Sequence, residues 1–158
     1  MTKTLEDRVS ELEARHQITE VIANYNHGID KRDVELFMDV WEENALWDLG
    51  DPEGCCRNKQ EILERLKISW RDVPKTHHYT VNIVINPDIK NGVATAISDL
   101  DATATNKEGI PLVIAGTYYD TFSNSTGKWR LTERKLRIHS FTPVSELASA
   151  KSSTRNSG

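Results

Sequence analysis

The sequence predicts an α+β fold in which about three N-terminal helices cover one face of a curved antiparallel sheet. Helical periodicity occupies the first half of the chain, and long alternating strands separated by Asn/Gly turns occupy the second half. Strands joined by such short turns pair as a meander. Because the 158 residues contain no repeat and no linker, we expect one domain at residues 1–146 and a flexible tail at 147–158.

The first helix is predicted from Thr4, with Asp7 as a weak capping partner, to His27. Gly28 can end it, because glycine tolerates a left-handed C-terminal cap. Two apolar stripes on roughly opposite sides indicate either a bend near His16 or two packing partners. We assign one stripe to the core and the other to a neighbouring subunit: respectively Ile18, Val21, Ile22, Tyr25 and Ile29, and Leu5, Val9 and Leu12.

Two further helices have clear N-terminal caps. Asp33 precedes a short apolar segment that ends near Trp41, and Asn58 precedes a helix that carries Ile62 and Leu66 on one face. A short strand is expected between them at residues 45–49. After Pro74 the pattern changes to four strands, predicted at residues 76–86, 93–105, 110–123 and 128–141.

Alternation along these strands assigns side chains to faces. It predicts a buried face formed by Tyr79, Val81, Ile83 and Ile85, and it puts Arg134 opposite Leu131. It also puts Asp99 and Asp101 on the same face as Val93 and Ile97. Carboxylates are costly on an apolar face unless they are paired, so this pattern favours a polar pocket in the sheet.

Composition excludes several classes of protein. The net charge of −4, with scattered Lys and Arg, argues against a nucleic-acid partner. No leader and no apolar run of membrane-spanning length is visible, so we expect no membrane partner. The adjacent Cys55 and Cys56 cannot build a disulfide framework and are read as two loop thiols, which suits a reducing, cytoplasmic location. No metal-ligand spacing is present, and no metal or cofactor is expected.

The residues alone leave the chemistry open. Asp30, directly after the expected helix end, is either a turn residue or a working carboxylate. A histidine such as His78 beside a carboxylate is the simplest unit for proton transfer, because the carboxylate fixes one ring nitrogen while the other takes a proton. An arginine or a tyrosine can stabilise the charge that develops on a leaving group.

Several short runs, taken in order, resemble the SnoaL-like branch of the NTF2-like superfamily, whose enzymes include hexachlorocyclohexane dehydrochlorinase, bile-acid 7α-dehydratase and scytalone dehydratase. The likeness spans roughly Leu5 to Pro143 and depends on the order and spacing of the runs, since no single motif is diagnostic. These runs are Gly28-Ile29-Asp30-Lys31-Arg32, Val40-Trp41-Glu42-Glu43-Asn44-Ala45-Leu46-Trp47, His78-Tyr79, Tyr118-Tyr119-Asp120, Gly127-Lys128-Trp129 and Phe141-Thr142-Pro143.

The resemblance implies site residues one by one. The family's catalytic aspartate falls on Asp30, its histidine base on His78 and the dehydrochlorinase arginine on Arg134. Tyr25 stands where the dehydrochlorinase has a lysine and the bile-acid dehydratase a tyrosine, which favours loss of water over loss of chloride. An acidic residue in the strand after the histidine fits Asp101 best and Asp99 less well. Two alternatives stay open: Tyr25 can be an ordinary core side chain, and Arg134 can be a surface residue paired with a carboxylate.

The function so implied is a cofactor-independent lyase of the dehydratase type, acting on a small cyclic or polycyclic hydrophobic substrate. An isomerase or cyclase of a polyketide- or steroid-like substrate, or a non-catalytic ligand-binding domain, would use the same pocket. The resemblance further implies a homo-oligomer, with a trimer favoured and a dimer possible.

Overall fold

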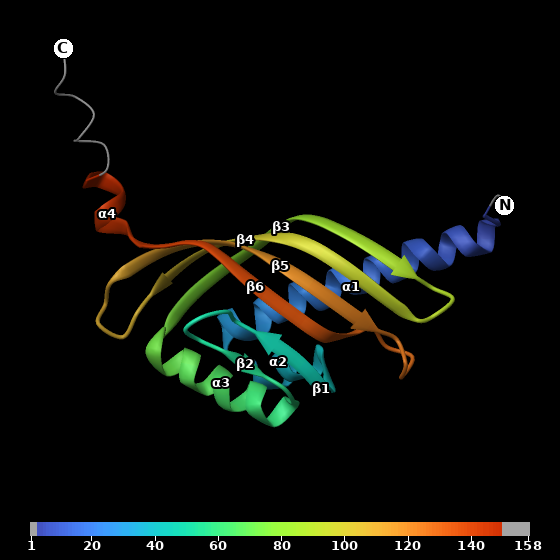
Figure 1. Ribbon diagram of the computed structural model, residues 1–158, viewed down its shortest axis with the longest axis horizontal. Helices are drawn as coiled ribbons and strands as arrows, with labels where there is room; N and C mark the ends of the chain where they lie inside the picture. Colours follow the sequence, from blue (N-terminus) through green and yellow to red (C-terminus); the bar gives the residue numbers. More distant parts are fainter. Residues whose placement is uncertain (1–2, 150–158) are drawn as a thin grey trace, which may run out of the picture.

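The structure, a computed structural model, describes residues 3–149 (Figure 1). It has the α+β architecture that the sequence predicts. The elements in chain order are α1 (Leu5–Lys31), α2 (Val34–Asp39), β1 (Trp41–Asp48), β2 (Cys55–Cys56), α3 (Lys59–Asp72), β3 (Lys75–Asp88), β4 (Val93–Thr105), β5 (Pro111–Ser123), β6 (Arg130–Pro143) and α4 (Val144–Ser149).

All three predicted helix caps are present. The Thr4 hydroxyl accepts the Asp7 N–H at 3.1 Å, and the Asp7 carboxylate accepts the Thr4 N–H at 2.9 Å, which forms a complete capping box. Asp33 and Asn58 cap α2 and α3 through their side-chain oxygens. Local sequence therefore fixes where each of these helices begins.

The prediction that Gly28 ends α1 is wrong. The helix continues to Lys31, and Arg32 adopts the left-handed cap with φ of +57°. Gly28 is required for a different reason, because a Cβ at this position would lie 2.7 Å from the backbone of Phe37 in α2. Asp30 is consequently held in the last turn of α1 and not in a loop.

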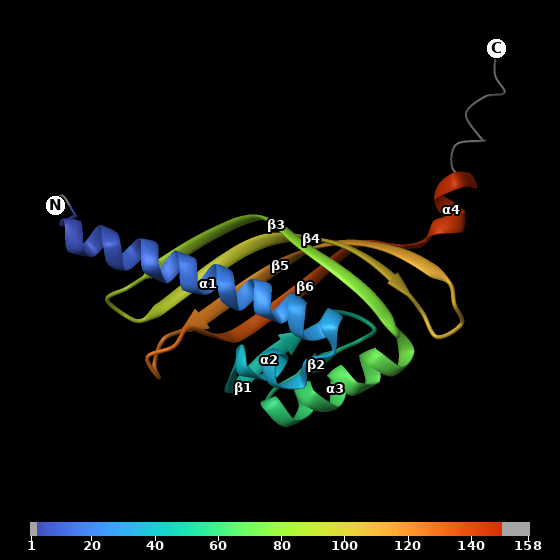
Figure 2. The same ribbon diagram turned by 180° about the vertical axis from the view of Figure 1, so that it is seen from behind.

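Six strands form one curved sheet in the order β2-β1-β6-β5-β4-β3. The last four strands make the predicted antiparallel meander, while β1 pairs parallel to β6. The helices α1, α2 and α3 lie on the same, inner side of this sheet, as the two opposite views show (Figures 1 and 2). Cys55 and Cys56 form a short edge strand paired with β1, so the prediction that they lie in a loop is wrong, and their thiols are free.

A bulge in β3 overturns part of the predicted strand faces. Pairing with β4 shifts register at Asn82, whose φ is +53°. As a result Tyr79 and Val81 are 56% and 46% exposed on the outer face, while Ile85 is 5% exposed inside. The prediction that these apolar residues share a buried face is wrong, and the face that carries His78 is the inner one.

Strand β4 alternates regularly, but its polar face is the outer one. Val93, Ile97 and Asp101 are exposed, whereas the small side chains between them, among them Ala96, face inward. The carboxylates that looked out of place on an apolar face are therefore in contact with solvent, and no buried unpaired charge arises.

Strand β6 contains a second correction. A register shift against β5, between Thr121 and Phe122, inserts one extra residue in β6. Leu131 and Arg134 consequently both point inward with no exposed surface, although simple alternation places them on opposite faces.

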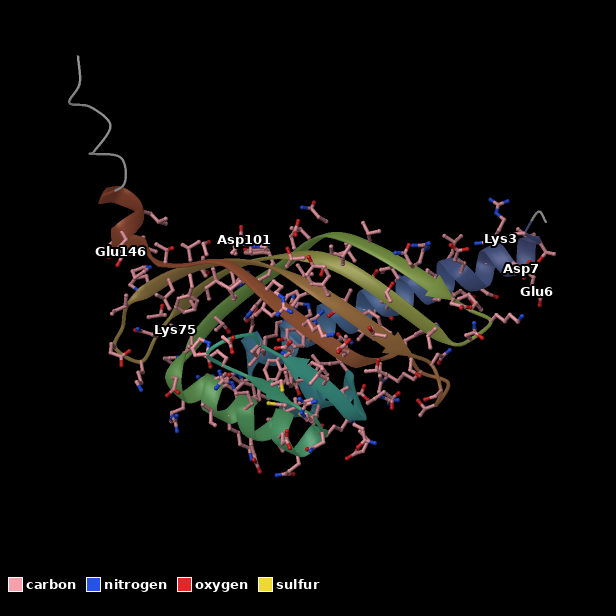
Figure 3. The ribbon with its side chains drawn as sticks, in the orientation of Figure 1. Lys3, Glu6, Asp7, Lys75, Asp101 and Glu146 are labelled. Carbon is pink, nitrogen blue, oxygen red and sulfur yellow. The ribbon has the colours of Figure 1, made fainter. Side chains whose placement is uncertain are left out.

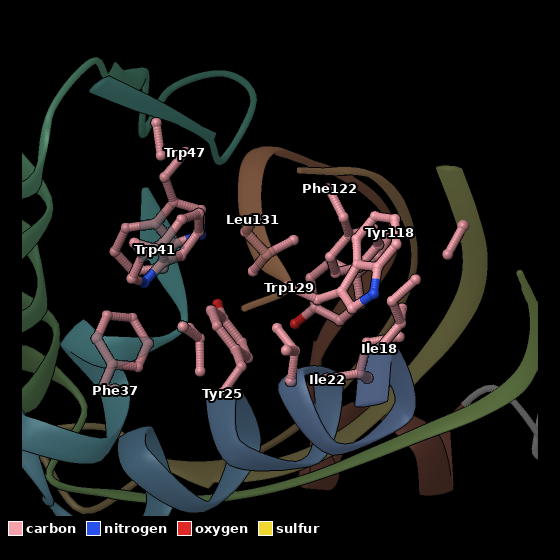
Figure 4. Packing of buried hydrophobic residues seen from close by; sticks show 14 of the residues in the cluster. Ile18, Ile22, Tyr25, Phe37, Trp41, Trp47, Tyr118, Phe122, Trp129 and Leu131 are labelled. Carbon is pink, nitrogen blue, oxygen red and sulfur yellow. The ribbon is translucent and has the colours of Figure 1, made fainter. Parts of the chain in front are cut away.

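The core lies between α1 and the inner face of the sheet (Figure 4). Aromatic side chains dominate the end near α2, with neighbouring ring centroids 5.1 to 6.2 Å apart in tilted and edge-on arrangements. These rings belong to Tyr25, Phe37, Trp41, Trp47 and Tyr118.

The outer face of the sheet and the first turns of α1 expose apolar side chains. We call the first group the outer patch: Tyr79, Val81, Val84, Val93, Ile97 and Tyr119 are each at least 41% exposed. The predicted second stripe of α1 is also exposed, with Leu5 at 74%, Val9 at 44% and Leu12 at 66%. Both surfaces are thus exposed to solvent in the described chain.

The predicted tail is only partly within the described residues. Residues 147–149 belong to α4, which extends past the expected domain end at Glu146. Residues 150–158 lie outside the described range. Between residues 3 and 149, none of the helices is long and apolar enough to cross a membrane.

Candidate active site

Asp30 and His78 form a hydrogen-bonded dyad between α1 and β3. The Asp30 Oδ1 atom lies 2.6 Å from His78 Nδ1 and accepts the Thr76 hydroxyl at 2.8 Å, while Oδ2 accepts the His78 backbone N–H at 2.8 Å. Only 14% of the Asp30 side chain and 12% of the His78 side chain are exposed. The structure thus brings these two predicted residues together.

The hydrogen bonds of the dyad favour an ionised Asp30 and fix which nitrogen of His78 faces it. Burial by itself raises the pKa of Asp30, but the hydrogen bonds from His78 and Thr76 outweigh it and hold the pKa below the ordinary value. An ionised carboxylate can only accept, so His78 Nδ1 must carry the proton that faces Asp30. In neutral histidine this leaves Nε2 as a free base.

A tertiary hydrogen bond holds the end of α1 in place beside the dyad. The indole N–H of Trp70, in the last turns of α3, donates to the carbonyl oxygen of Ile29 at 2.8 Å. Arg32 donates to the carbonyl oxygens of Trp70 and Pro74, both at 2.9 Å. Asp30 is thereby anchored between residues that bind the C-terminal end of α3.

A cavity of about 470 Å³ opens beside His78. This volume lies within the range of small-molecule sites. Its wall is mostly apolar and comes from Ile29, Trp47, Leu49, Trp70, Val73, Leu100, Ile114, Leu136, Ile138 and Phe141. The polar lining residues are Tyr25, Asp51, Glu53, Arg65, Ser69, Thr76, His78 and Tyr118. Since Nδ1 of His78 is bound to Asp30, Nε2 is the nitrogen left for a ligand in this cavity.

Tyr25 and Tyr118 enclose the guanidinium of Arg134. Its Cζ lies 4.1 Å from the centroid of the Tyr25 ring and 4.2 Å from that of Tyr118. Two of its nitrogens donate to Asp120, at 2.8 and 2.7 Å, and Nη1 is buried without a partner. Both tyrosines line the cavity, whereas Arg134 is not among the lining residues and lies behind them.

Burial raises the pKa of Tyr25, and the nearby positive charge of Arg134 works in the opposite direction. The net effect keeps the hydroxyl protonated at neutral pH. Tyr25 can therefore donate a proton or a hydrogen bond into the cavity, and Arg134 favours the phenolate left after a transfer.

Asp101 does not join the site. It is exposed on the outer face, where it pairs across the strands with Tyr79, and Figure 3 shows it on the side of the sheet away from α3. Asp99 is on the same outer face, hydrogen-bonded to Asn82 and Thr117. The expectation that one of these carboxylates lines the pocket is wrong, because β4 presents its small and apolar side chains to the interior.

Some site residues were missed at the sequence level. Tyr118 and Asp120 share an inward face with Phe122, so a carboxylate on an apolar strand face was the available signal for the Arg134 partner. Thr76 is two residues from His78 on the same strand face, which is a weaker signal. Among residues 3–149 no group of three or more His, Cys, Asp or Glu side chains is arranged to hold a metal ion.

Comparisons with known proteins agree with this architecture. Residues 10–135 match the SnoaL-like domain family. Hexachlorocyclohexane dehydrochlorinase 1 of Sphingobium indicum is 22% identical over 142 residues, which cover 84% of this chain and 86% of that protein.

Two solved structures extend the comparison. Type 3 hexachlorocyclohexane dehydrochlorinase from Novosphingobium barchaimii has a TM-score of 0.80 at 20% identity and covers 87% of this chain and 94% of its own. A candidate scytalone dehydratase from Novosphingobium aromaticivorans has a TM-score of 0.78 at 20% identity, with coverage of 86% and 91%. These likenesses confirm the predicted NTF2-like cone.

Proposed function

The chain belongs to the SnoaL-like domain family, and on this premise we propose that it is a cofactor-independent lyase that removes water from a small cyclic or polycyclic hydrophobic substrate. One observation carries the proposal: the His78–Asp30 dyad stands at the wall of a largely apolar cavity. A base in a water-poor pocket is what proton abstraction from carbon requires.

In the proposed reaction, Nε2 of His78 takes a proton from a substrate carbon, and Asp30 stabilises the imidazolium that forms. The electron pair of the broken C–H bond becomes the new carbon–carbon double bond. The bond between the neighbouring carbon and its oxygen breaks, and the Tyr25 hydroxyl protonates the departing oxygen, which leaves as water. Arg134, over the Tyr25 ring, stabilises the transient phenolate. The imidazolium proton then returns to Tyr25, directly or through solvent.

An isomerase or cyclase is the second candidate, because the same dyad can return its proton to another substrate carbon. Product mass separates the two reactions: elimination lowers it by one water, whereas isomerisation leaves it unchanged. A non-catalytic binding domain would bind the ligand and form no product.

The test is a screen of hydroxylated cyclic and polycyclic ketones with mass detection, run on the native chain and on His78→Ala. We expect loss of water from at least one compound with the native chain only. His77→Ala is the matched control, since His77 is the exposed neighbour of the base. Equal turnover by His78→Ala and the native chain would refute the proposed mechanism.

We also propose that the outer patch is covered by further copies of this chain in a homo-oligomer, with a trimer as the first expectation. The exposed α1 stripe of Leu5, Val9 and Leu12 offers a second apolar surface for the same assembly. Contiguous exposed apolar side chains are uncommon on monomers of this size, which supports an interface.

A further inference from the structure

Arg65 is the one lysine or arginine among the described residues that line the cavity. It lies on α3 one turn before Ser69, on the side that faces the cavity, between the buried Ile62 and Leu66. Its side chain is only 22% exposed. Arg134, by contrast, lies behind Tyr25 and Tyr118 and is already paired twice with Asp120.

The Arg65 guanidinium has unused capacity. One nitrogen, Nη2, is paired with the Glu53 carboxylate, and Nε is buried without any partner. A guanidinium has five donors and binds carboxylates best through two parallel hydrogen bonds. The observed pairing with Glu53 therefore leaves the cation incompletely satisfied in a mostly apolar wall.

A ligand can displace the Glu53 carboxylate from the Arg65 guanidinium. It lies on the connection between β1 and β2, and half of its side chain is exposed to solvent. The connection contains Gly50 and Gly54, both with positive φ. Because an exposed carboxylate is well hydrated once it turns outward, exchanging it for a ligand oxygen costs little.

Arg65 and the residue of α3 that contacts the dyad region lie at different positions along this helix. Trp70 in the last turns of the helix bonds to the residue next to Asp30. Arg65 precedes Trp70 by five positions, which is roughly 7.5 Å along the helix axis. Because Arg65 and His78 both line the cavity, a ligand that fills it can contact both residues.

We infer that Arg65 is a substrate-binding residue that recognises an anionic oxygen, so that the substrate class is a hydrophobic cyclic carboxylate. Glu53 is the internal carboxylate that the substrate displaces. This inference rests on the proposed function only in calling the ligand a substrate. The competing view is that Glu53 and Arg65 merely latch the connection between β1 and β2 onto α3.

The two views predict opposite effects for Glu53→Gln. If Glu53 competes with the ligand, removing its charge frees the guanidinium and tightens anion binding. If the ion pair is only a latch, the same change loosens the cavity wall and weakens charged and neutral ligands alike.

The test uses 2-naphthoate and its neutral methyl ester as probes, with dissociation constants measured by calorimetry on the full chain. We expect the native chain to bind 2-naphthoate at least about tenfold more tightly than the ester, the effect of a charge-assisted hydrogen bond. Arg65→Gln removes this preference but keeps the ester affinity, which shows that the cavity is intact. Arg65→Lys keeps part of the preference, and Glu53→Gln increases it.

The inference is overturned if Arg65→Gln keeps the preference, if Glu53→Gln weakens both probes equally, or if 2-naphthoate does not bind the native chain. If Arg65→Gln fails to fold, the affinities of Arg65→Lys and Glu53→Gln still distinguish anion recognition from a structural latch. His77→Ala, an exposed position outside the cavity lining, should bind 2-naphthoate like the native chain. If the chain prefers the anion but turns over no compound, the proposed lyase is refuted and the role of Arg65 in anion binding is supported. If it turns over a compound but shows no anion preference, the lyase is supported and the role of Arg65 is refuted.

Discussion

Asp30 and His78 are 48 positions apart in the sequence, yet the carboxylate Oδ1 and the imidazole Nδ1 lie 2.6 Å from each other. The carboxylate also holds the histidine backbone N–H and the Thr76 hydroxyl. In the proposed mechanism this arrangement makes Asp30 a positioning group for the base, and its consequences can be measured.

Replacing Asp30 by Asn should lower turnover by about 10²–10⁴-fold, the usual contribution of a general base. The amide has one acceptor oxygen where three donors now meet a carboxylate, so its NH₂ group faces a donor or the Nδ1 atom of His78. An NH₂ group in the place of Oδ1 donates to Nδ1 and favours the tautomer with a proton on Nε2, which cannot abstract one. An NH₂ group in the place of Oδ2 meets the His78 backbone N–H, a second donor, and so loosens the hold on the histidine. Steady-state rates on a substrate found by the screen test this, with His77→Ala as control. Undiminished turnover in Asp30→Asn would contradict the assigned role.

The lowered pKa of Asp30 also predicts a pH-dependent stability. A carboxyl group whose folded pKa is below its unfolded value stabilises the fold above that unfolded value, about 3.8, and loses this contribution as pH falls through the folded pKa. The gap in unfolding free energy between the native chain and Asp30→Asn should therefore be larger at neutral pH than near pH 3. Urea unfolding at both pH values measures it, and a gap that widens on acidification would contradict the shift.

Breaking the buried pair of Arg134 and Asp120 should cost much stability. Both side chains have no exposed surface, so Asp120→Asn leaves a buried cation without its counter-charge, at a cost of about 3–5 kcal/mol. The double replacement Asp120→Leu with Arg134→Met should recover part of this loss, because no lone charge remains. Lys128→Met, which removes an exposed ion pair with Asp39, serves as the control and should change stability little. The midpoints of urea unfolding for the native chain, Asp120→Asn, the double variant and Lys128→Met test this prediction.

Gly28→Ala should destabilise the fold although alanine is the better helix former. The new Cβ would lie 2.7 Å from the Phe37 backbone, and such overpacking costs about 1–3 kcal/mol, more than the gain in helix propensity. His27→Ala, on the exposed side of the same turn, should be neutral or slightly stabilising. Thermal unfolding of both variants tests whether close packing requires this glycine. Equal changes in stability for Gly28→Ala and His27→Ala would contradict that explanation.

If the outer patch joins copies of the chain, Val84→Glu should dissociate the assembly. Val84 is 53% exposed beside Ile97 on the neighbouring strand, so a charge there would be buried unpaired in an interface. Ile68→Glu places the same charge on the exposed side of α3 and should leave association unchanged. Sedimentation equilibrium distinguishes the two, and a native chain that sediments as a monomer would end the proposal.

The order of elements follows from local signals in the sequence. Thr4, Asp33 and Asn58 cap their helices through atoms at most a few residues away, and Asn/Gly turns set the strand boundaries. The family resemblance then assigned Asp30 and His78 to one site, and the structure brings them together.

Strand faces needed the tertiary structure. A single bulged residue inverts the alternation, and the register shifts at Asn82 and near Leu131 depend on pairing with another strand. For this reason the buried face of β3 and the position of Leu131 were mispredicted. Asp101 was misplaced for a related reason, because alternation separates two faces without telling which one the helices cover.

The stretch from Tyr25 to Asp30 shows where the division falls. Local signals predict a helix here, with Gly28 and the Asp30 carboxylate near its end, because helix propensity and side-chain chemistry depend on neighbouring residues. The tertiary structure, in contrast, sets the packing of α2 against Gly28 and the continuation of α1 to Lys31. It also decided that Arg134 lies behind Tyr25 and that Arg65 faces the cavity, since those contacts form between segments far apart in the chain.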